Sequence, residues 1–221
     1  MKGTYQAFPI VMGYFAIGIP FGILAVKGGL SLWAAIALSL CVYAGSAQFV
    51  ALQLLASAAG FFPIYVATFL LNLRHFLMAT SLGSALPNMR TPFLTLFAHL
   101  ITDESYAINI GKVKLDEYLN PWNALGTSVT AFLTWNIATG IGYLAGSQIR
   151  VDFKYIEGAL PVMFIALLGL QLKERKHWIF SGFSSLLTFL FMLLLPSKWP
   201  FLLTAILIPS AIVFYEQRKV Q

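Results

Sequence analysis

The chain contains continuous apolar segments, several of them close to twenty residues long. About twenty apolar residues in an α-helix cross the hydrocarbon core of a bilayer, whereas transmembrane β-strands are short segments of alternating pattern. Only 10% of the residues are charged and 59% are hydrophobic, compared with about 25% charged residues in soluble domains. The sequence therefore predicts an all-α polytopic membrane protein.

We expect about eight transmembrane helices in a single domain, residues 1–221. The count becomes seven if the second or the last apolar segment is not a full span. The predicted spans are Phe8–Val26, Leu30–Ala59, Phe61–Leu86, Pro92–Gly111, Ala124–Gly146, Gly158–Leu172, Trp178–Leu195 and Trp199–Tyr215.

A polar connection, Lys112–Asn120, separates two similar halves, about residues 1–111 and 119–221. Ala16–Phe21 (AIGIPF) resembles Ala138–Tyr143 (ATGIGY), and each of them precedes a polar turn and two apolar segments. Internal repeats are common in transporters. The resemblance is therefore compatible with a weak internal repeat.

The first span contains Gly18, Pro20 and Gly22 close together. Proline lacks a backbone N–H and its ring clashes with the preceding turn of a helix. We therefore expect the helix to loosen or break near its end, as broken spans of transporters do. The alternative is an ordinary proline kink, with the small residues serving close helix packing.

The second apolar segment, Leu30–Ala59, is too long for one upright span. It must tilt or break, and we expect a break or a close helix contact at Tyr43–Phe49 (YAGSAQF). Gly45 is the candidate hinge in this stretch.

The third segment, Phe61–Leu86, carries Asn72, Arg74 and His75 near its middle. An ionised side chain at that depth costs at least about 3 kcal/mol on membrane-insertion scales. Such a charge therefore needs a partner, a water-filled cavity or a function.

Counting residues from the turns identifies partners for Arg74. Arg74 lies 15 residues before Met89 in one turn, and Asp103 lies 14 residues after it. Arg74 also lies 14 residues after Gly60, and Ser46 lies 14 residues before it. Because a helix rises 1.5 Å per residue, straight neighbouring helices would place these three residues at nearly the same depth.

We therefore predict a buried polar site near the middle of the membrane. One alternative stays open, namely that Arg74 and Asp103 form only a structural ion pair. The candidate substrate or proton pathway comprises Tyr43, Ser46, Gln48, Asn72, Arg74, His75, Asp103 and Glu104.

Motifs of the common enzyme classes are absent: the sequence has no Walker phosphate loop, no HExxH and no GxSxG. Cys41 is the only cysteine, and His75, His99 and His177 lie on different segments. We therefore expect no enzyme activity, no metal site and no cofactor. The basic residues behind the net charge of +6 lie mainly in short connections, so we expect no nucleic-acid partner.

The lack of an ATP-binding motif means that active transport would need an ion gradient or a separate subunit. His75, Asp103 and Glu104 are candidate proton carriers in a dry site. Arg74 is always charged and is suited to holding a carboxylate. We expect a substrate carboxylate to displace Asp103 from Arg74, which leaves Asp103 free to take a proton.

Basic residues are more frequent in cytoplasmic loops than in external ones. In the eight-span arrangement with both termini inside, eight basic residues fall inside and five outside, which favours cytoplasmic termini. The inner set is Lys2, Lys112, Lys114, Lys173, Arg175, Lys176, Arg218 and Lys219, and the outer set is Lys27, Arg90, Arg150, Lys154 and Lys198.

Five segments, in order along most of the chain, resemble the AzlC family of branched-chain amino-acid permeases: Pro20–Gly22, Tyr43–Phe49, Asn72–His75, Thr102–Tyr106 and Ala159–Ala166. The resemblance implies an exporter of leucine, isoleucine, valine or methionine in a bacterial inner membrane. It also implies a much smaller membrane partner of the AzlD type. Self-association into a homo-oligomer, and a channel or scaffold protein with a structural charge cluster, stay open as alternatives.

Overall fold

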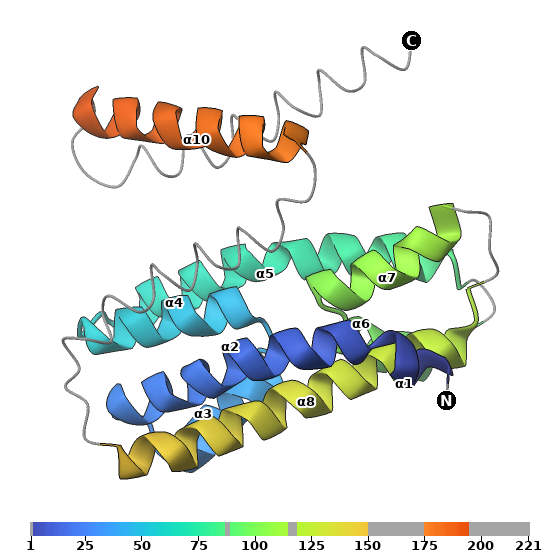
Figure 1. Ribbon diagram of the computed structural model, residues 1–221, viewed down its shortest axis with the longest axis horizontal. Coiled ribbons are helices and arrows are strands. Elements are labelled where there is room, and N and C mark those ends of the chain that lie inside the picture. Colours follow the sequence, from blue (N-terminus) through green and yellow to red (C-terminus); the bar gives the residue numbers. More distant parts are fainter. Residues whose placement is uncertain (1, 87–88, 115–118, 150–174, 195–221) are drawn as a thin grey trace. The chain divides into compact units, whose positions relative to one another are not determined.

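The computed structural model describes residues 2–86, 89–114, 119–149 and 175–194. All regular secondary structure in these residues is helical (Figure 1), as the sequence predicts. The chain divides into two compact units, Met1–Leu160 and Pro161–Gln221, and each is described by itself. The predicted spans Gly158–Leu172 and Trp199–Tyr215, and the motif Ala159–Ala166, lie outside the described residues.

Two long helices, α2 (Phe8–Lys27) and α8 (Pro121–Gln148), form the most extensive helix contact of the first unit (Figure 1). A short helix, α1 (Lys2–Gln6), precedes α2. Small residues allow the close approach, since a Cβ atom added to Gly146 would lie only 2.8 Å from Ile23 Cα. Backbones of membrane helices commonly approach through such small residues.

Helix α2 is continuous through Gly18, Pro20 and Gly22, so the predicted break in the first span is wrong. The packing alternative describes these glycines better. A Cβ atom on Gly22 would collide with the carbonyl oxygen of Thr139 on α8. A proline inside a helix costs about 3 kcal/mol or more, and the contact between α2 and α8 offsets this cost.

The second apolar segment breaks where the sequence predicts. It forms α3 (Leu32–Cys41) and α4 (Gly45–Ala56), with Tyr43 in the connection between them. Tyr43 has a φ of 42°, in the left-handed region that residues other than glycine seldom adopt. A single helix therefore cannot continue through this position.

Helices α3 and α4 form a hairpin that returns to the end of the unit where it began. At its start, the Leu30 carbonyl accepts a 2.9 Å hydrogen bond from Tyr143, near the last turns of α8. Towards its end, Leu52 of α4 contacts the position of Gly28, which directly follows α2. The segment Leu30–Ala59 therefore forms two short helices in a hairpin and not one continuous helix, which agrees with the break expected at Tyr43–Phe49.

The next helix, α5 (Phe61–Ser84), begins at the end of the unit where α8 ends and runs to the opposite end. The fourth apolar segment begins at that opposite end. This segment was expected to be one helix but forms α6 (Thr91–His99) and α7 (Asp103–Lys114). The ring of Phe93 in α6 lies 5.5 Å from that of Trp122, at the start of α8. Helix α6 therefore begins at the same end of the unit as α8.

Helix α7 returns to the same end as the start of α6. Lys112 Nζ donates a 2.6 Å hydrogen bond to Gln6 Oε1, just before α2. The segment Pro92–Gly111 is therefore a second hairpin and not a span. Arg90, which was assigned to the opposite side from Lys112, lies at the same end of the unit.

Local capping explains the break between α6 and α7. The Thr102 N–H donates a 2.9 Å hydrogen bond to Ser105 Oγ, and the Ser105 N–H lies 3.5 Å from Thr102 Oγ1. This reciprocal pattern resembles a capping box, which begins a helix. Asp103 and Glu104 lie in the first turn of α7, where the helix dipole favours negative charge.

The described part of the first unit thus contains three long helices, α2, α5 and α8, and two hairpins that enter from opposite ends (Figure 1). The irregular segments at the hairpin tips are covered by the protein, with Tyr43 3% and Ile101 0% exposed. Non-helical backbone at membrane depth is tolerated only where it is buried in protein or lines a water-filled cavity.

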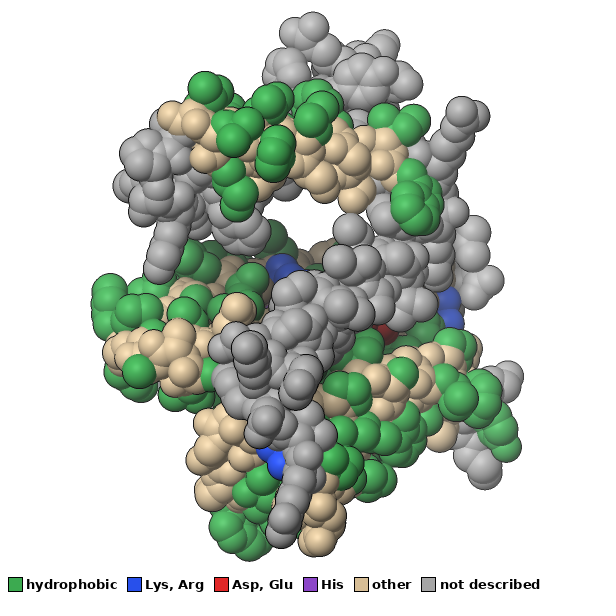
Figure 2. All heavy atoms as spheres, turned by 60° about the vertical axis from the view of Figure 1, so that its left-hand side comes forward, with side chains coloured by type: hydrophobic (Ala, Val, Ile, Leu, Met, Phe, Trp, Pro, Cys, Tyr) green, Lys and Arg blue, Asp and Glu red, His purple; other side chains and the backbone are tan. Residues whose placement is uncertain are grey.

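Of the described helices, α2 and α5 are long and apolar enough to cross a membrane. Large apolar side chains are exposed along α5, including Phe62 (74%) and Phe76 (67%). Figure 2 shows hydrophobic side chains over much of the described surface that faces the viewer. In the second unit, α10 (Arg175–Leu194) corresponds to the predicted span Trp178–Leu195.

Candidate functional site

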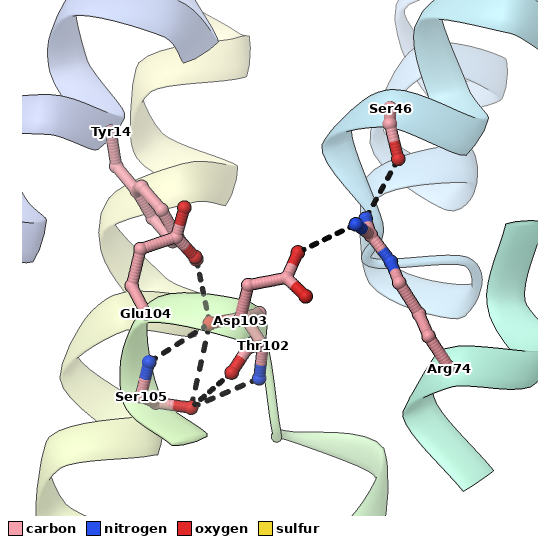
Figure 3. Close-up of polar contacts among 7 residues, drawn as sticks. All are labelled: Tyr14, Ser46, Arg74, Thr102, Asp103, Glu104 and Ser105. Atoms are coloured by element: carbon pink, nitrogen blue, oxygen red, sulfur yellow. Dashed lines mark hydrogen bonds and ion pairs between the residues drawn. The ribbon is translucent and has the colours of Figure 1, made fainter. Parts of the chain in front are cut away.

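Arg74, near the middle of α5, contacts one residue from each hairpin (Figure 3). Its Nη1 atom forms a 2.9 Å ion pair with Asp103 Oδ2, and its Nη2 atom donates a 2.7 Å hydrogen bond to Ser46 Oγ. The side chains of Arg74 and Asp103 are 41% and 39% exposed. The three residues that were predicted to share one depth therefore lie in contact.

The two helix breaks bring these partners to Arg74. Ser46 is the second residue of α4 and Asp103 is the first residue of α7. The residue count assumed two complete spans, which is wrong, but it identified the correct neighbours because each hairpin tip lies at the level of Arg74. Ala44, the residue before α4, makes no side-chain cap hydrogen bond, and the positive end of this helix lies beside the guanidinium group.

Glu104 has different neighbours from Asp103. The hydroxyl of Tyr14 on α2 lies 2.7 Å from Glu104 Oε2 and 2.7 Å from Thr102 Oγ1. This hydroxyl has one proton, so it donates to one of these oxygens at a time. In Figure 3, Tyr14 approaches α7 from one side and Arg74 from the other.

Sequence reasoning missed Tyr14 and Thr102 as members of this cluster. An isolated tyrosine in an apolar span has no pattern that distinguishes it from a packing residue. Thr102 did carry a signal, because the order Thr102-Asp-Glu-Ser105 is typical of a helix start.

Tyr43 lies at the tip of the first hairpin. Its ring packs edge-on against Phe132 at 4.8 Å, and its hydroxyl is buried and forms no well-aligned hydrogen bond within the described residues. The Glu104 carboxylate and the hydroxyls of Tyr14 and Thr102 lie close to this hydroxyl. The structure thus brings Tyr43 to the Glu104 side of the cluster.

Gln48 belongs to a separate polar network. Its Nε2 atom donates a 2.9 Å hydrogen bond to Ser39 Oγ, which lies 3.1 Å from Thr139 Oγ1. All three side chains are completely buried and join α3, α4 and α8. This network ties the first hairpin to α8 and does not contact Arg74.

The other predicted residues lie near the cluster without joining its hydrogen bonds. His75 Nδ1 and Asn72 Oδ1 are buried and have no hydrogen-bond partner within the described residues. Gly45 begins α4, where a Cβ atom would lie 3.1 Å from the indole ring of Trp135. Among the described side chains, no group of three His, Cys, Asp or Glu could hold a metal ion.

The cluster therefore combines a permanent cation and two carboxylates between the beginnings of α4 and α7. Guanidinium binds carboxylates, and a carboxylate can accept a proton or an ammonium group. This arrangement can bind a small charged molecule and exchange a proton.

The residues of this cluster lie in a region that matches a known protein family. The AzlC protein family matches residues 9–149, which include the whole Arg74 cluster. A membrane protein of Archaeoglobus fulgidus is 31% identical over 180 residues, 79% of this chain and 76% of the relative. No solved structure matches the chain.

Two further relatives have descriptive names. Inner membrane protein YgaZ of Escherichia coli is 28% identical over 76% of this chain and 69% of its own. The branched-chain amino acid transport protein AzlC of Bacillus subtilis is 26% identical over 77% of this chain and 67% of its own. The chain is therefore a membrane protein that belongs to the AzlC family.

Proposed function

We propose that the chain is the large subunit of an exporter of branched-chain and other hydrophobic amino acids, including leucine, isoleucine, valine and methionine. The family supports amino-acid transport, since one member is named for branched-chain amino acid transport. The observation that carries the proposal is the contact of Arg74 with Asp103 and Ser46 where two broken helices begin.

The substrate carboxylate replaces Asp103 on Arg74. The guanidinium group presents two nitrogens, of which one now contacts Asp103 and the other Ser46. The uncapped N–H groups at the start of α4 add favourable electrostatics, as half-helices do for anionic substrates in transporters. Release from Arg74 leaves the Asp103 carboxylate without its cation and favours its protonation.

This exchange couples substrate to protons. We propose that the proton gradient drives export and that Asp103, Glu104 or His75 carries the proton. The sequence has no ATP-binding motif, which is consistent with a gradient-driven exporter.

A small membrane subunit of the AzlD type is the proposed partner, and a homo-oligomer is the alternative assembly. The proposed location is a bacterial inner membrane, with cytoplasmic termini. Arg90 and Lys112 lie at the same end of the first unit as Gln6, close to the N-terminus, and these basic residues support this orientation.

The second candidate is a channel or scaffold protein. Two hairpins that enter from opposite ends and meet at mid-depth also suit a channel, where half-helix dipoles set selectivity. In this case the half-exposed ion pair of Arg74 with Asp103 is structural, and a matched apolar pair can replace it without loss of function.

Efflux of leucine and valine from preloaded cells tests the proposal. We expect faster efflux only when the chain and its small partner are expressed together, and we expect a protonophore to abolish it. Arg74→Ala at normal expression should reduce efflux to background, because the substrate carboxylate loses its cation. Arg90→Ala is the matched control, since Arg90 is exposed in the connection before α6.

The double variant Arg74→Met with Asp103→Leu separates the two candidates. An exporter that binds its substrate at Arg74 loses efflux in this variant. Full efflux in the double variant would favour the structural interpretation, and unchanged efflux in every condition would remove the amino-acid assignment.

A further inference from the structure

Adjacent carboxylates at the start of α7 have opposite electrostatic situations. Asp103 is paired with the guanidinium group of Arg74, whereas Glu104 is hydrogen-bonded to the neutral hydroxyl of Tyr14. In the described part of the chain, no Lys, Arg or His side chain forms an ion pair with Glu104. Glu104 is therefore the acidic group of the cluster that is free to receive a cation.

A second observation points to the same place. The hydroxyl of Tyr43 is buried and forms no well-aligned hydrogen bond within the described residues, and it lies close to Glu104 and to the hydroxyls of Tyr14 and Thr102. Tyr43 is only 3% exposed, although its backbone has an uncommon left-handed conformation. A buried hydroxyl without a well-aligned hydrogen bond beside an uncompensated carboxylate is suited to a ligand that donates hydrogen bonds.

The geometry points to Glu104 as the binding site for the ammonium group of the transported amino acid, with Tyr14 as a positioning residue that holds the carboxylate. This inference rests on the proposed function, in which Arg74 takes the substrate carboxylate. An amino acid has its ammonium and carboxylate groups on one carbon atom, so it needs an anion and a cation close together. Asp103 and Glu104 are consecutive residues, of which Asp103 pairs with Arg74 and Glu104 contacts Tyr14 (Figure 3). Arg74 therefore provides the cation, and the neighbouring Glu104 provides the anion.

The ammonium group has three N–H donors. Glu104 accepts one of them and neutralises the charge, and the Tyr43 hydroxyl oxygen accepts another. Tyr14 anchors Glu104 to α2, because the same hydroxyl also contacts Thr102 at the tip of the second hairpin. The site therefore recognises both charges of a zwitterion.

Two ligands that differ only at the ammonium group test this inference. Leucine is compared with 2-hydroxy-4-methylpentanoate, which keeps the carboxylate and the side chain but has a hydroxyl group in place of the ammonium. The full chain and its small partner are reconstituted in vesicles, and leucine transport is measured with the hydroxy acid as an inhibitor. Glu104→Gln should raise the half-saturating leucine concentration about 30-fold or more, with inhibition by the hydroxy acid unchanged within about twofold.

Tyr14→Phe provides a second variant that keeps the size of the side chain. It should raise the leucine value several-fold, again without an equal effect on the hydroxy acid. Tyr106→Phe is the matched control, because Tyr106 also lies on α7 but its hydroxyl lies 3.1 Å from Ser81 Oγ, outside the cluster. Tyr106→Phe should leave both ligands unaffected.

The outcomes separate this inference from the proposed function. If wild-type vesicles transport leucine but Glu104→Gln leaves its affinity unchanged, or weakens both ligands equally, the ammonium assignment is wrong and the exporter stands. If the wild-type protein neither transports nor binds leucine, the proposed function fails and the ammonium assignment fails with it.

Discussion

At the scale of single residues, Arg74 organises the polar cluster through the shape of its side chain. One terminal nitrogen contacts Asp103 and the other contacts Ser46, so a single residue links α5 to both hairpins. A guanidinium group presents its donors in a fixed planar fork, whereas a lysine ammonium group is a compact point charge. The arrangement therefore depends on more than the positive charge.

We predict that Arg74→Lys reduces leucine export about tenfold or more, although the charge is kept. The substitution removes one of two charge-assisted hydrogen bonds, each with a contribution of about 1.5–3 kcal/mol. Export from preloaded cells at matched expression is the measurement, with Arg90→Lys as control. Full export by Arg74→Lys would show that two-pronged binding of the carboxylate is not required.

At the scale of elements, the hairpins and the contact between α2 and α8 have distinct sequence origins. The first hairpin breaks at the left-handed Tyr43 and the second at the capping sequence Thr102–Ser105, and both tips are covered by the protein. The α2–α8 contact depends on small residues, since a Cβ atom on Gly18 would lie 2.8 Å from Ala138 Cβ. Ala138–Tyr143, which resembles Ala16–Phe21, thus lies in the α8 region that packs against α2.

We predict opposite effects of two glycine-to-alanine substitutions on α2. Gly22→Ala should lower the melting temperature of the detergent-purified protein, because overpacking costs about 1–3 kcal/mol and exceeds the gain in helix propensity. Gly13→Ala, with no atom within 4 Å of the added Cβ, should leave the melting temperature unchanged or raise it. Equal effects of the two substitutions would contradict the close contact at Gly22.

At the scale of the whole molecule, the hairpins change which connections share a side of the membrane. The eight-span arrangement places Arg90 and Lys112 on opposite sides, whereas the structure places both ends of the α6–α7 hairpin at the end of the unit near Gln6. Three long helices and two hairpins therefore replace five full spans in the region up to α8.

Cysteine labelling distinguishes the two arrangements. In a Cys41→Ser background, we expect single cysteines at Arg90 and Lys112 to react with a membrane-impermeant maleimide from the same side. With cytoplasmic termini, both should react only after the cells are permeabilised. Labelling of Arg90→Cys in intact cells, with Lys112→Cys protected, would support the eight-span arrangement instead.

The amino-acid sequence was sufficient to predict the class of protein and the central contacts. Its low charge content and long apolar segments exclude most soluble folds. The depth of Arg74 relative to the turns identified Ser46 and Asp103, because helix rise converts residue number directly into distance. The family resemblance was also correct.

Tertiary structure decided how the chain runs through these segments. Composition alone does not distinguish a full transmembrane span from a pair of half-length helices, because both are apolar over the same number of residues. Only contacts such as Lys112 with Gln6 show that a hairpin returns to its starting end. Likewise, Tyr14 joined the cluster through a partner 90 residues away, since local sequence carries no information on such a contact.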